Sequence, residues 1–345
     1  MSGPLDQGVQ LAANAARFGW YYGINQLVDA RARRAGQQPG YRPSRPVPTR
    51  RQLLEQLGRL LVADAAAVRD GTLPPADADG KAVVGHLDRL RAMFLDLPQV
   101  FARRDAATAD SARDQPDADG MPDYYTQDFH FQTGGYLSPQ SARLYDIQVE
   151  TLFYGAANAM RRAALRPIAD ALGRRDQRQL ALLDVACGTG RFLRQVRLRW
   201  PALQLTGLDL SEPYLDEARG HMAPLRPARL IAGNAEAIPL ADASQDVVSV
   251  VFLYHELPGE VRRRVTAEIA RVLKPGGVLV FVDSLQMGDR PGWDGLLEAF
   301  PVRFHEPYFR HYVIDDLDAQ FTQAGLAPVE QALPFLSKLM ARRKA

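Results

Sequence analysis

An acidic residue followed by two closely spaced glycines is the group in this chain that points most clearly to ligand chemistry. Residues 182–190 read LLDVACGTG, so Asp184 ends an apolar run, and Gly188 and Gly190 follow it. This order predicts a buried strand, a tight turn and the first turn of a helix, whose free N–H groups face a ligand. Leu193 stands where a dinucleotide loop has its third glycine, and Asp184 would repel a pyrophosphate. The loop therefore favours a cationic ligand, with a turn that binds no ligand as the plainer alternative.

Two further polar residues follow apolar runs at positions that suit an adenosyl ligand. Asp209 ends the run 203–209 and lies about 20 residues after Gly190, the spacing expected of a carboxylate that binds ribose hydroxyls. Asn234 follows the run 229–232, and its amide can both donate to and accept from an adenine edge. S-adenosylmethionine carries a sulfonium, an ammonium and an adenosine, so it matches this set of residues.

Apolar runs alternate with helical stretches through the second half of the chain. The runs lie at 182–185, 203–209, 229–232, 246–253 and 278–282. A Pro-Gly-Gly sequence at 275–277 ends a helix and turns the chain into the last of these runs. Strands that alternate with helices imply a parallel sheet with helices on both faces.

These motifs together resemble the class I S-adenosylmethionine-dependent methyltransferases, and within them the small-molecule and quinone-biosynthesis subgroup. The matching segments read LLDVACGTGRF, GLDLS, GNAEAIPL, DASQDVV and RVLKPGGVLVFVDS, in this order. The resemblance covers about residues 145–345. It implies an α/β fold with a Rossmann-like, mostly parallel seven-stranded sheet, and S-adenosyl-L-methionine as the cofactor.

The resemblance also implies a set of cofactor-binding residues. Asp184 and the two glycines would cradle the amino-acid part of the cofactor, and Asp209 would hold the ribose. Asn234 would meet the adenine edge, where many relatives have Asp. The full set is Asp184, Ala186, Gly188, Gly190, Asp209, Leu210, Asn234, Ala235 and Leu253.

Two histidines, each followed by a glutamate, are the candidate catalytic groups. His255 and Glu256 follow the fourth apolar run, at the edge where open α/β sheets bind ligands. A histidine there can take a proton from a substrate hydroxyl, amine or carbon acid, and Glu256 can orient it. His305 and Glu306 are secondary candidates in an insertion before the last predicted helix, at 315–324. Alternatively His255 caps the next helix, since in-line methyl transfer requires alignment and does not always require a base.

An aromatic segment before the first strand is the candidate acceptor pocket. Residues 124–138 are rich in aromatic and turn residues, and Ser138 can cap a helix that starts at Pro139 and runs to about residue 162. In methyltransferases that resemble this chain, the corresponding segment folds over the cofactor and forms part of the substrate pocket. The pocket residues expected on that basis are His130, Tyr136, Tyr145 and Tyr308. An aromatic seam between two domains is the alternative.

The first third of the chain predicts a separate helical region. Three stretches read as helices: 8–34, 51–69 and 81–104. Residues 105–120 are polar and rich in Asp and Ala, which predicts an acidic linker. We therefore expect a small all-helical N-terminal domain at 1–122 and a methyltransferase domain at 123–345, whose first part, 123–175, forms a cap. The helical domain is the candidate surface for a homodimer.

Composition limits the classes of partner and compartment. The chain has 345 residues, of which 46% are apolar, and a formal net charge of +2. This charge favours no anionic partner and disfavours nucleic acid. Cys187 is the only cysteine, so an internal disulfide and a cysteine-rich metal site are excluded, and no carboxylate cluster in the sequence suggests a metal. Because we find neither a signal peptide nor an apolar run that could span a membrane, the expected location is the cytoplasm.

Three functions remain open. A methyltransferase that acts on a small, aromatic or apolar acceptor is favoured, because the aromatic segment suits such a molecule. A nucleic-acid or protein methyltransferase is the second, since residues 31–51 are basic, although residues 253–258 read LYHELP and lack the Pro-Pro-aromatic run of base-amine methylation. A non-catalytic scaffold that binds the cofactor is the third. The sequence defines neither the acceptor nor the atom that is methylated.

Overall fold

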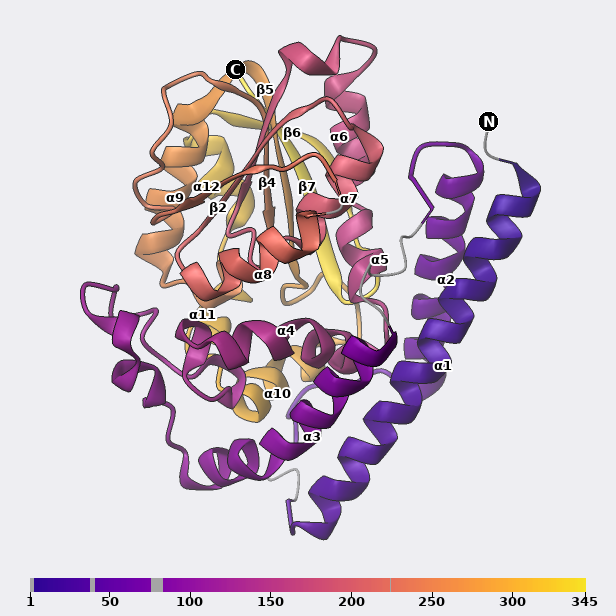
Figure 1. Ribbon diagram of the computed structural model, residues 1–345, viewed down its shortest axis with the longest axis vertical. Coiled ribbons are helices and arrows are strands. Elements are labelled where there is room, and N and C mark those ends of the chain that lie inside the picture. The colour runs from indigo at the N-terminus through magenta and orange to yellow at the C-terminus, as the bar shows by residue number, and fades with distance from the viewer. Residues whose placement is uncertain (1–2, 38–40, 76–82, 224) are drawn as a thin grey trace.

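A seven-stranded sheet lies at the centre of the protein in the computed structural model, which describes residues 3–37, 41–75, 83–223 and 225–345 (Figure 1). The strand order is β3-β2-β1-β4-β5-β7-β6, and among the described strands β7 alone runs antiparallel to its neighbours. The strands are β1 (Ala181–Val185), β2 (Gln204–Asp209), β3 (Arg229–Ala232), β4 (Gln245–Val251), β5 (Leu273–Ser284), β6 (Leu326–Ala332) and β7 (Ser337–Lys344). The predicted Rossmann-like, mostly parallel sheet is confirmed.

Helices cover both faces of the sheet and bury its central strands. One face carries α6 (Leu165–Leu172), α7 (Arg191–Arg199) and α8 (Glu212–Met222), and the other carries α9 (Gly259–Val272) and α12 (Leu317–Gln323). On α9, Val261, Val265 and Ile269 recur at helical spacing and pack into the core. Strand β4 carries valines on both sides because it is buried on both sides, as expected of a central parallel strand, and its buried Ser249 is hydrogen-bonded to β1.

The remaining elements of this region surround the carboxyl ends of the strands or lead into β1. They are η3 (Phe129–Phe131), η4 (Gly135–Leu137), α4 (Pro139–Leu152), α5 (Ala157–Arg162), η5 (Gln177–Gln179), η6 (Tyr254–Glu256), α10 (Asp294–Phe304) and α11 (Phe309–Tyr312). Ser138 caps α4 as predicted, because its hydroxyl accepts a hydrogen bond from the Ser141 N–H at 3.0 Å. The helix does not continue to residue 162, because the chain turns at Gly155, whose φ is +80°.

The two positions of the predicted loop require glycine for different structural reasons. Gly190 caps α7 with φ +74°, and a Cβ there would lie 2.9 Å from the Ala218 Cβ on α8. Gly188 has φ +53°, but a Cβ there would meet only a Tyr214 ring carbon, at 4.0 Å. Gly190 is therefore required for helix packing, whereas Gly188 leaves open space above the loop.

The N-terminal helices form where the sequence predicts them. They are α1 (Pro4–Arg34), α2 (Arg50–Arg69) and α3 (Val83–Ala106), and α1 and α2 pack side by side (Figure 1). Residues 81 and 82, the predicted start of the third helix, lie outside the described residues. No helix in the described part of the chain is long and apolar enough to cross a membrane.

A buried arginine connects the N-terminal helices to the rest of the molecule. Arg162 at the end of α5 is 1% exposed, and it donates to the Asp64 carboxylate of α2 at 2.6 Å and to Gln195 of α7 at 2.9 Å. Val68 of α2 packs in the same apolar cluster as α6 and α7. Removing one partner of such a buried ion pair costs about 3–5 kcal/mol. The helices are thus tightly attached, and the domain boundary at residue 122 stays a prediction.

Residues 105–120, where the sequence predicts an acidic linker, contain two short helical turns, and the linker itself stays a prediction. This stretch contains η1 (Ser111–Asp114) and η2 (Pro116–Ala118). The buried carboxylate of Asp128 accepts hydrogen bonds from the Ser111 and Ala112 N–H groups at 3.1 and 2.8 Å, and Ala112 is fully buried. These residues turn tightly around one carboxylate. A polar composition is compatible with such an ordered turn and with a linker, so it does not distinguish the two.

Substituting the two loop glycines should separate packing from ligand space. We expect Gly190→Ala to lower the free energy of unfolding by about 2–4 kcal/mol, because a left-handed backbone and a clash with α8 add together. Gly188→Ala carries only the backbone cost, about 1–2 kcal/mol. Urea unfolding followed by circular dichroism measures both, and equal losses would contradict this assignment.

Candidate functional site

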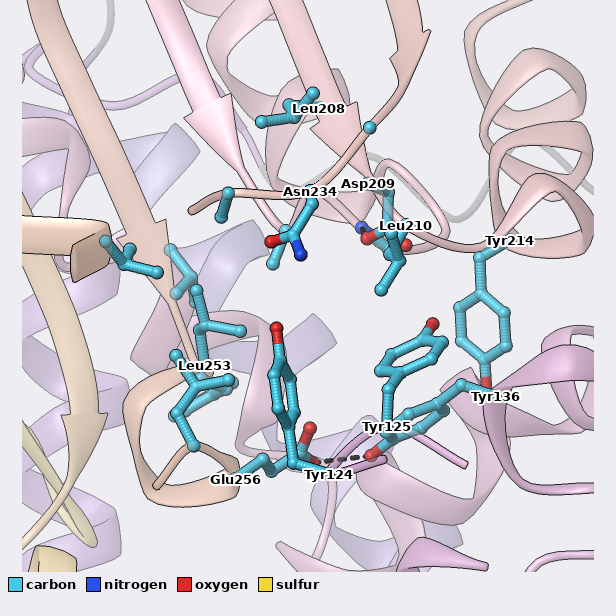
Figure 2. A pocket seen from close by; sticks show the side chains of 18 of the residues that line it. Tyr124, Tyr125, Tyr136, Leu208, Asp209, Leu210, Tyr214, Asn234, Leu253 and Glu256 are labelled. Carbon is cyan, nitrogen blue, oxygen red and sulfur yellow. Dashed lines mark hydrogen bonds between the residues drawn. The ribbon is translucent and has the colours of Figure 1, made fainter. Parts of the chain in front are cut away.

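A pocket opens at the carboxyl ends of β1, β2 and β4, and residues from the segment before β1 form its opposite wall (Figure 2). Its lining includes five tyrosines: Tyr124, Tyr125, Tyr136, Tyr145 and Tyr214. The other lining residues are Ala186, Gly188, Leu208, Asp209, Leu210, Gly233, Asn234, Ala235, Val251, Phe252, Leu253, Glu256, Leu257 and Val265. The site therefore lies where an open α/β sheet binds ligands.

Seven of the nine predicted cofactor residues line this pocket. They are Ala186, Gly188, Asp209, Leu210, Asn234, Ala235 and Leu253. The other two lie behind the wall: Asp184 is buried under the loop, and Gly190 faces α8. Both residues hold the loop in place, and any part of theirs in binding the cofactor stays a prediction.

Asp209 is the central charged group of the pocket. One carboxylate oxygen accepts from the Gly188 N–H at 2.7 Å and the other from the Ser211 N–H at 2.9 Å. Burial raises the pKa of Asp209 to about 6, and these hydrogen bonds oppose that rise. The carboxylate thus ties the glycine loop to the end of β2 and still faces the pocket (Figure 2).

Asp184 supports the same loop from below. Its carboxylate accepts a hydrogen bond from the Ser249 hydroxyl on β4 at 2.6 Å, which links β1 to β4. Burial raises the pKa of Asp184 to about 7, and the negative charge of Asp209 adds to this effect. The two carboxylates are therefore poorly hydrated, and a positive charge nearby would stabilise both.

Asn234 is partly occupied by its neighbour Glu236. Its side-chain oxygen accepts from the Glu236 N–H at 2.8 Å, and its amide nitrogen donates to the Glu236 carboxylate at 3.2 Å. The hydroxyl of Tyr124 donates to the same carboxylate at 2.7 Å. The amide has a second hydrogen that could meet an adenine edge. Figure 2 shows the Tyr124 ring standing in the pocket and pointing toward Asn234.

The lining residues fit S-adenosylmethionine. In the described part of the chain, the charged groups that line the pocket are Asp209 and Glu256, both acidic. The ligand is positively charged and aromatic, so it suits a wall of carboxylates and tyrosine rings. The open space above Gly188 lets a ligand lie against the backbone.

The predicted catalytic pair is divided between the pocket and the interior. Glu256 lines the pocket and accepts a hydrogen bond from the Tyr136 hydroxyl, drawn as a dashed line in Figure 2. His255 does not line it, because its ring donates from Nδ1 to the Asp283 carboxylate at the end of β5. Burial lowers the pKa of His255, but Asp283 and Glu256 outweigh burial and raise it to about 10. The ring therefore carries a proton at neutral pH.

The structure places three other predicted residues away from the pocket wall. His305 packs on the Phe131 ring, and burial lowers its pKa. Tyr308 accepts a hydrogen bond from Gln127 at 2.8 Å. His130 lies behind Glu256, with its Nε2 atom 3.0 Å from a carboxylate oxygen of Glu306. Their proposed roles in binding or catalysis gain no support from the pocket wall itself.

The predicted aromatic pocket residues Tyr136 and Tyr145 do line the pocket, and sequence reasoning missed some of their partners. The Tyr136 ring stacks on Phe129 at 5.4 Å and meets Tyr214 edge to face at 5.4 Å. Tyr214 stands in the first turn of α8, directly after β2, and Tyr125 belongs to the aromatic segment. Position after a strand end could have identified Tyr214, since that edge binds ligands.

Comparisons with known proteins agree with this geometry. Residues 182–277 match the model of a family described as a methyltransferase domain. A ubiquinone/menaquinone biosynthesis C-methyltransferase of Methylobacterium nodulans is 33% identical over 168 residues, which are 47% of this chain and 63% of that protein. A malonyl-[acyl-carrier protein] O-methyltransferase of Xylella fastidiosa is 40% identical over 114 residues, 32% of this chain and 36% of that protein.

The match to these relatives spans less than two thirds of each relative's own length. Among solved structures, a SAM-dependent methyltransferase from Aquifex aeolicus shares 16% identity, with a TM-score of 0.38, and the match covers 52% of this chain and 88% of that one. The family match assigns residues 182–277 to a methyltransferase domain, and the strand order of the sheet agrees with this assignment.

Binding of S-adenosylmethionine should weaken as the pH falls from 8 to 5. Asp184 and Asp209, with pKa values of about 7 and about 6, become neutral over this range and lose their attraction for a cation. We expect about a tenfold or greater rise in Kd by pH 5, measured by calorimetry. Asp209→Asn should bind more weakly at pH 8 and depend less on pH. A constant Kd in protein that circular dichroism shows to be folded would contradict this expectation.

Proposed function

The chain carries a class I S-adenosylmethionine-dependent methyltransferase domain, and we propose that it transfers the methyl group of this cofactor to a small aromatic or apolar acceptor. The observation that carries the proposal is one pocket that combines the buried carboxylate of Asp209, the open loop at Gly188 and a wall of tyrosines. The negative charge of Asp209 suits the positively charged cofactor, and the apolar faces of the tyrosine rings suit an aromatic or apolar acceptor.

The acceptor that we favour is a quinol with an unsubstituted ring carbon. The Methylobacterium relative is named for C-methylation in quinone biosynthesis, and the Tyr136, Tyr145 and Phe252 rings offer flat apolar surface beside the pocket. A ring carbon next to a hydroxyl attacks the methyl group in line, and S-adenosylhomocysteine leaves. The ring carbon then gives up its proton, a proton returns to the ring oxygen, and the ring becomes aromatic again, so that one proton is released in net. This chemistry requires alignment and a place for the proton of the hydroxyl.

We assign removal of that proton to a group of three side chains, His130, Glu256 and Glu306, named here the acidic cluster. Glu256 reaches the pocket wall. His255 lies behind the wall, and its Nδ1–H donates a hydrogen bond to the Asp283 carboxylate. General-base help from His255 itself is thus the second choice. His255 instead holds a charge beside Glu256, with 3.8 Å between its Nε2 atom and the nearer carboxylate oxygen.

Large acceptors and a scaffold function are the alternatives. The segment that contains Tyr124, Tyr125 and Tyr136 covers the pocket, which disfavours entry of a nucleic acid or a folded protein. A near-neutral net charge of +2 supports the same choice. We propose a cytoplasmic location for the enzyme. We also propose the N-terminal helices as the surface of a homodimer, and sedimentation of the purified chain would test whether it forms a dimer.

Methyl transfer from labelled cofactor tests the proposed acceptor. Purified protein is incubated with methyl-labelled S-adenosylmethionine and a short-chain naphthoquinol that lacks the ring methyl group. We expect label in the organic extract, and at least about a tenfold loss in Gly188→Ala, which fills the space above the loop but keeps the fold. Label found only in protein or nucleic acid would favour a macromolecular acceptor. Cofactor binding without any transfer from cell extract would favour a scaffold.

A matched pair of variants tests the role of Glu256. Glu256→Gln keeps the hydrogen bond from Tyr136 but removes the charge, so kcat should fall about a hundredfold, whereas the Kd for the cofactor should rise by less than about tenfold because Asp209 remains. His255→Gln should lower kcat less than Glu256→Gln does. A larger loss in His255→Gln would return the base role to His255.

A further inference from the structure

Three side chains that are far apart in the sequence meet behind the pocket. His130 comes from η3, Glu256 from η6, and Glu306 from the turn after α10. One ligand atom of each lies within 4.8 Å of the other two. The Nε2 atom of His130 is 3.0 Å from an oxygen of Glu306 and 3.8 Å from an oxygen of Glu256. The sequence singles out each of the three residues but does not show that they meet, because no two of them are neighbours in the chain.

Glu306 lacks the hydrogen bonds that a buried carboxylate requires. It is 1% exposed, and neither of its carboxylate oxygens has a hydrogen-bond partner. The nearer oxygen lies beside the His130 ring nitrogen at 3.0 Å but without the geometry of a hydrogen bond. A buried carboxylate without hydrogen bonds costs several kcal/mol, so a cation that binds Glu306 would stabilise the site.

The distances suit a metal ion in the middle of the cluster. Bonds of about 2.1 Å from a metal to nitrogen and oxygen place neighbouring ligand atoms about 3.0–3.4 Å apart. The His130 nitrogen lies 3.0 and 3.8 Å from the two carboxylate oxygens, and all three ligand atoms lie within 4.8 Å of one another, so the side chains need to move only slightly inward to bind an ion.

The surroundings hold the imidazole in this position. His130 has a left-handed backbone, with φ +55°, an uncommon conformation for a residue with a side chain. Its ring meets Phe300 and Phe304 edge to face, at 6.4 and 6.2 Å. Apolar rings keep water away and strengthen the attraction between the carboxylates and a cation.

We propose that His130, Glu256 and Glu306 bind one divalent transition-metal ion, of the class of zinc, iron(II) or manganese. One imidazole and two carboxylates form a ligand set that such ions accept, and three protein ligands leave further coordination positions open. Because Glu256 also lines the pocket, an open position can face the bound acceptor. Resting on the proposed function, the metal would bind the acceptor oxygen and make its proton easier to remove.

Zinc binding to the purified chain tests the site in the absence of cofactor and acceptor. The protein is treated with chelator, dialysed and titrated with Zn²⁺ in a calorimeter, and metal content after purification is measured by mass spectrometry. We expect one zinc per chain. His130→Asn and Glu306→Gln should each weaken binding by about a hundredfold, since each removes one ligand.

His305→Asn is the matched control. His305 also has a left-handed backbone, with φ +45°, and also packs on a phenylalanine, but it lies outside the cluster. Asn tolerates this conformation at both positions, so the two His→Asn variants should fold alike. Zinc binding should survive in His305→Asn.

Two results would overturn the metal site. One is a folded wild-type chain that binds no zinc at micromolar concentration. The other is equal zinc affinity in the wild type, His130→Asn and His305→Asn. Should Glu306→Gln fail to fold, His130→Asn decides alone. Zinc binding without methyl transfer to a quinol would contradict the proposed acceptor and leave the metal site supported.

Discussion

The burial of carboxylates at the carboxyl ends of parallel strands is the constraint on which the rest of the site depends. Asp209 and Asp184 sit where little water reaches them, so each must be satisfied by donors from neighbouring segments. The Gly188 N–H and the Ser249 hydroxyl supply those donors. Because these hydrogen bonds join β1, β2 and β4 to the loop, they fix the shape of the pocket and leave it selective for a positively charged ligand.

Carboxylates are also buried on the opposite side of the pocket, but of Asp283 and Glu306 only Asp283 has hydrogen-bond donors in the described part of the chain. The Asp283 carboxylate accepts from the Tyr254 N–H at 2.7 Å and from the ring of His255, so it is fully engaged. Glu306 has no comparable donors, although it is equally buried. Asp283 is therefore satisfied by donors within the protein, whereas Glu306 lies beside the His130 imidazole without a hydrogen bond and would be stabilised by a cation bound to the acidic cluster.

Local patterns in the sequence correctly predicted the features that depend on residues close together in the chain. The apolar runs, the helix cap at Ser138 and the glycine loop each depend on neighbours in the chain, and all three are present. The acidic cluster and the position of His255 depend on contacts between distant segments, which periodicity does not reveal. Composition did not reveal the hydrogen bonds of the polar stretch at Ser111 to the buried carboxylate of Asp128.

The position of the cofactor relative to Asp209 tests the central claim most directly. A crystal structure with S-adenosylhomocysteine would give the distances from the Asp209 carboxylate oxygens to the ribose hydroxyls. Distances of about 2.6–3.0 Å, with the adenine beside Asn234, are the expected result. A ligand that lies elsewhere, or ribose hydroxyls more than about 4 Å from the carboxylate, would contradict the role assigned to this buried acid.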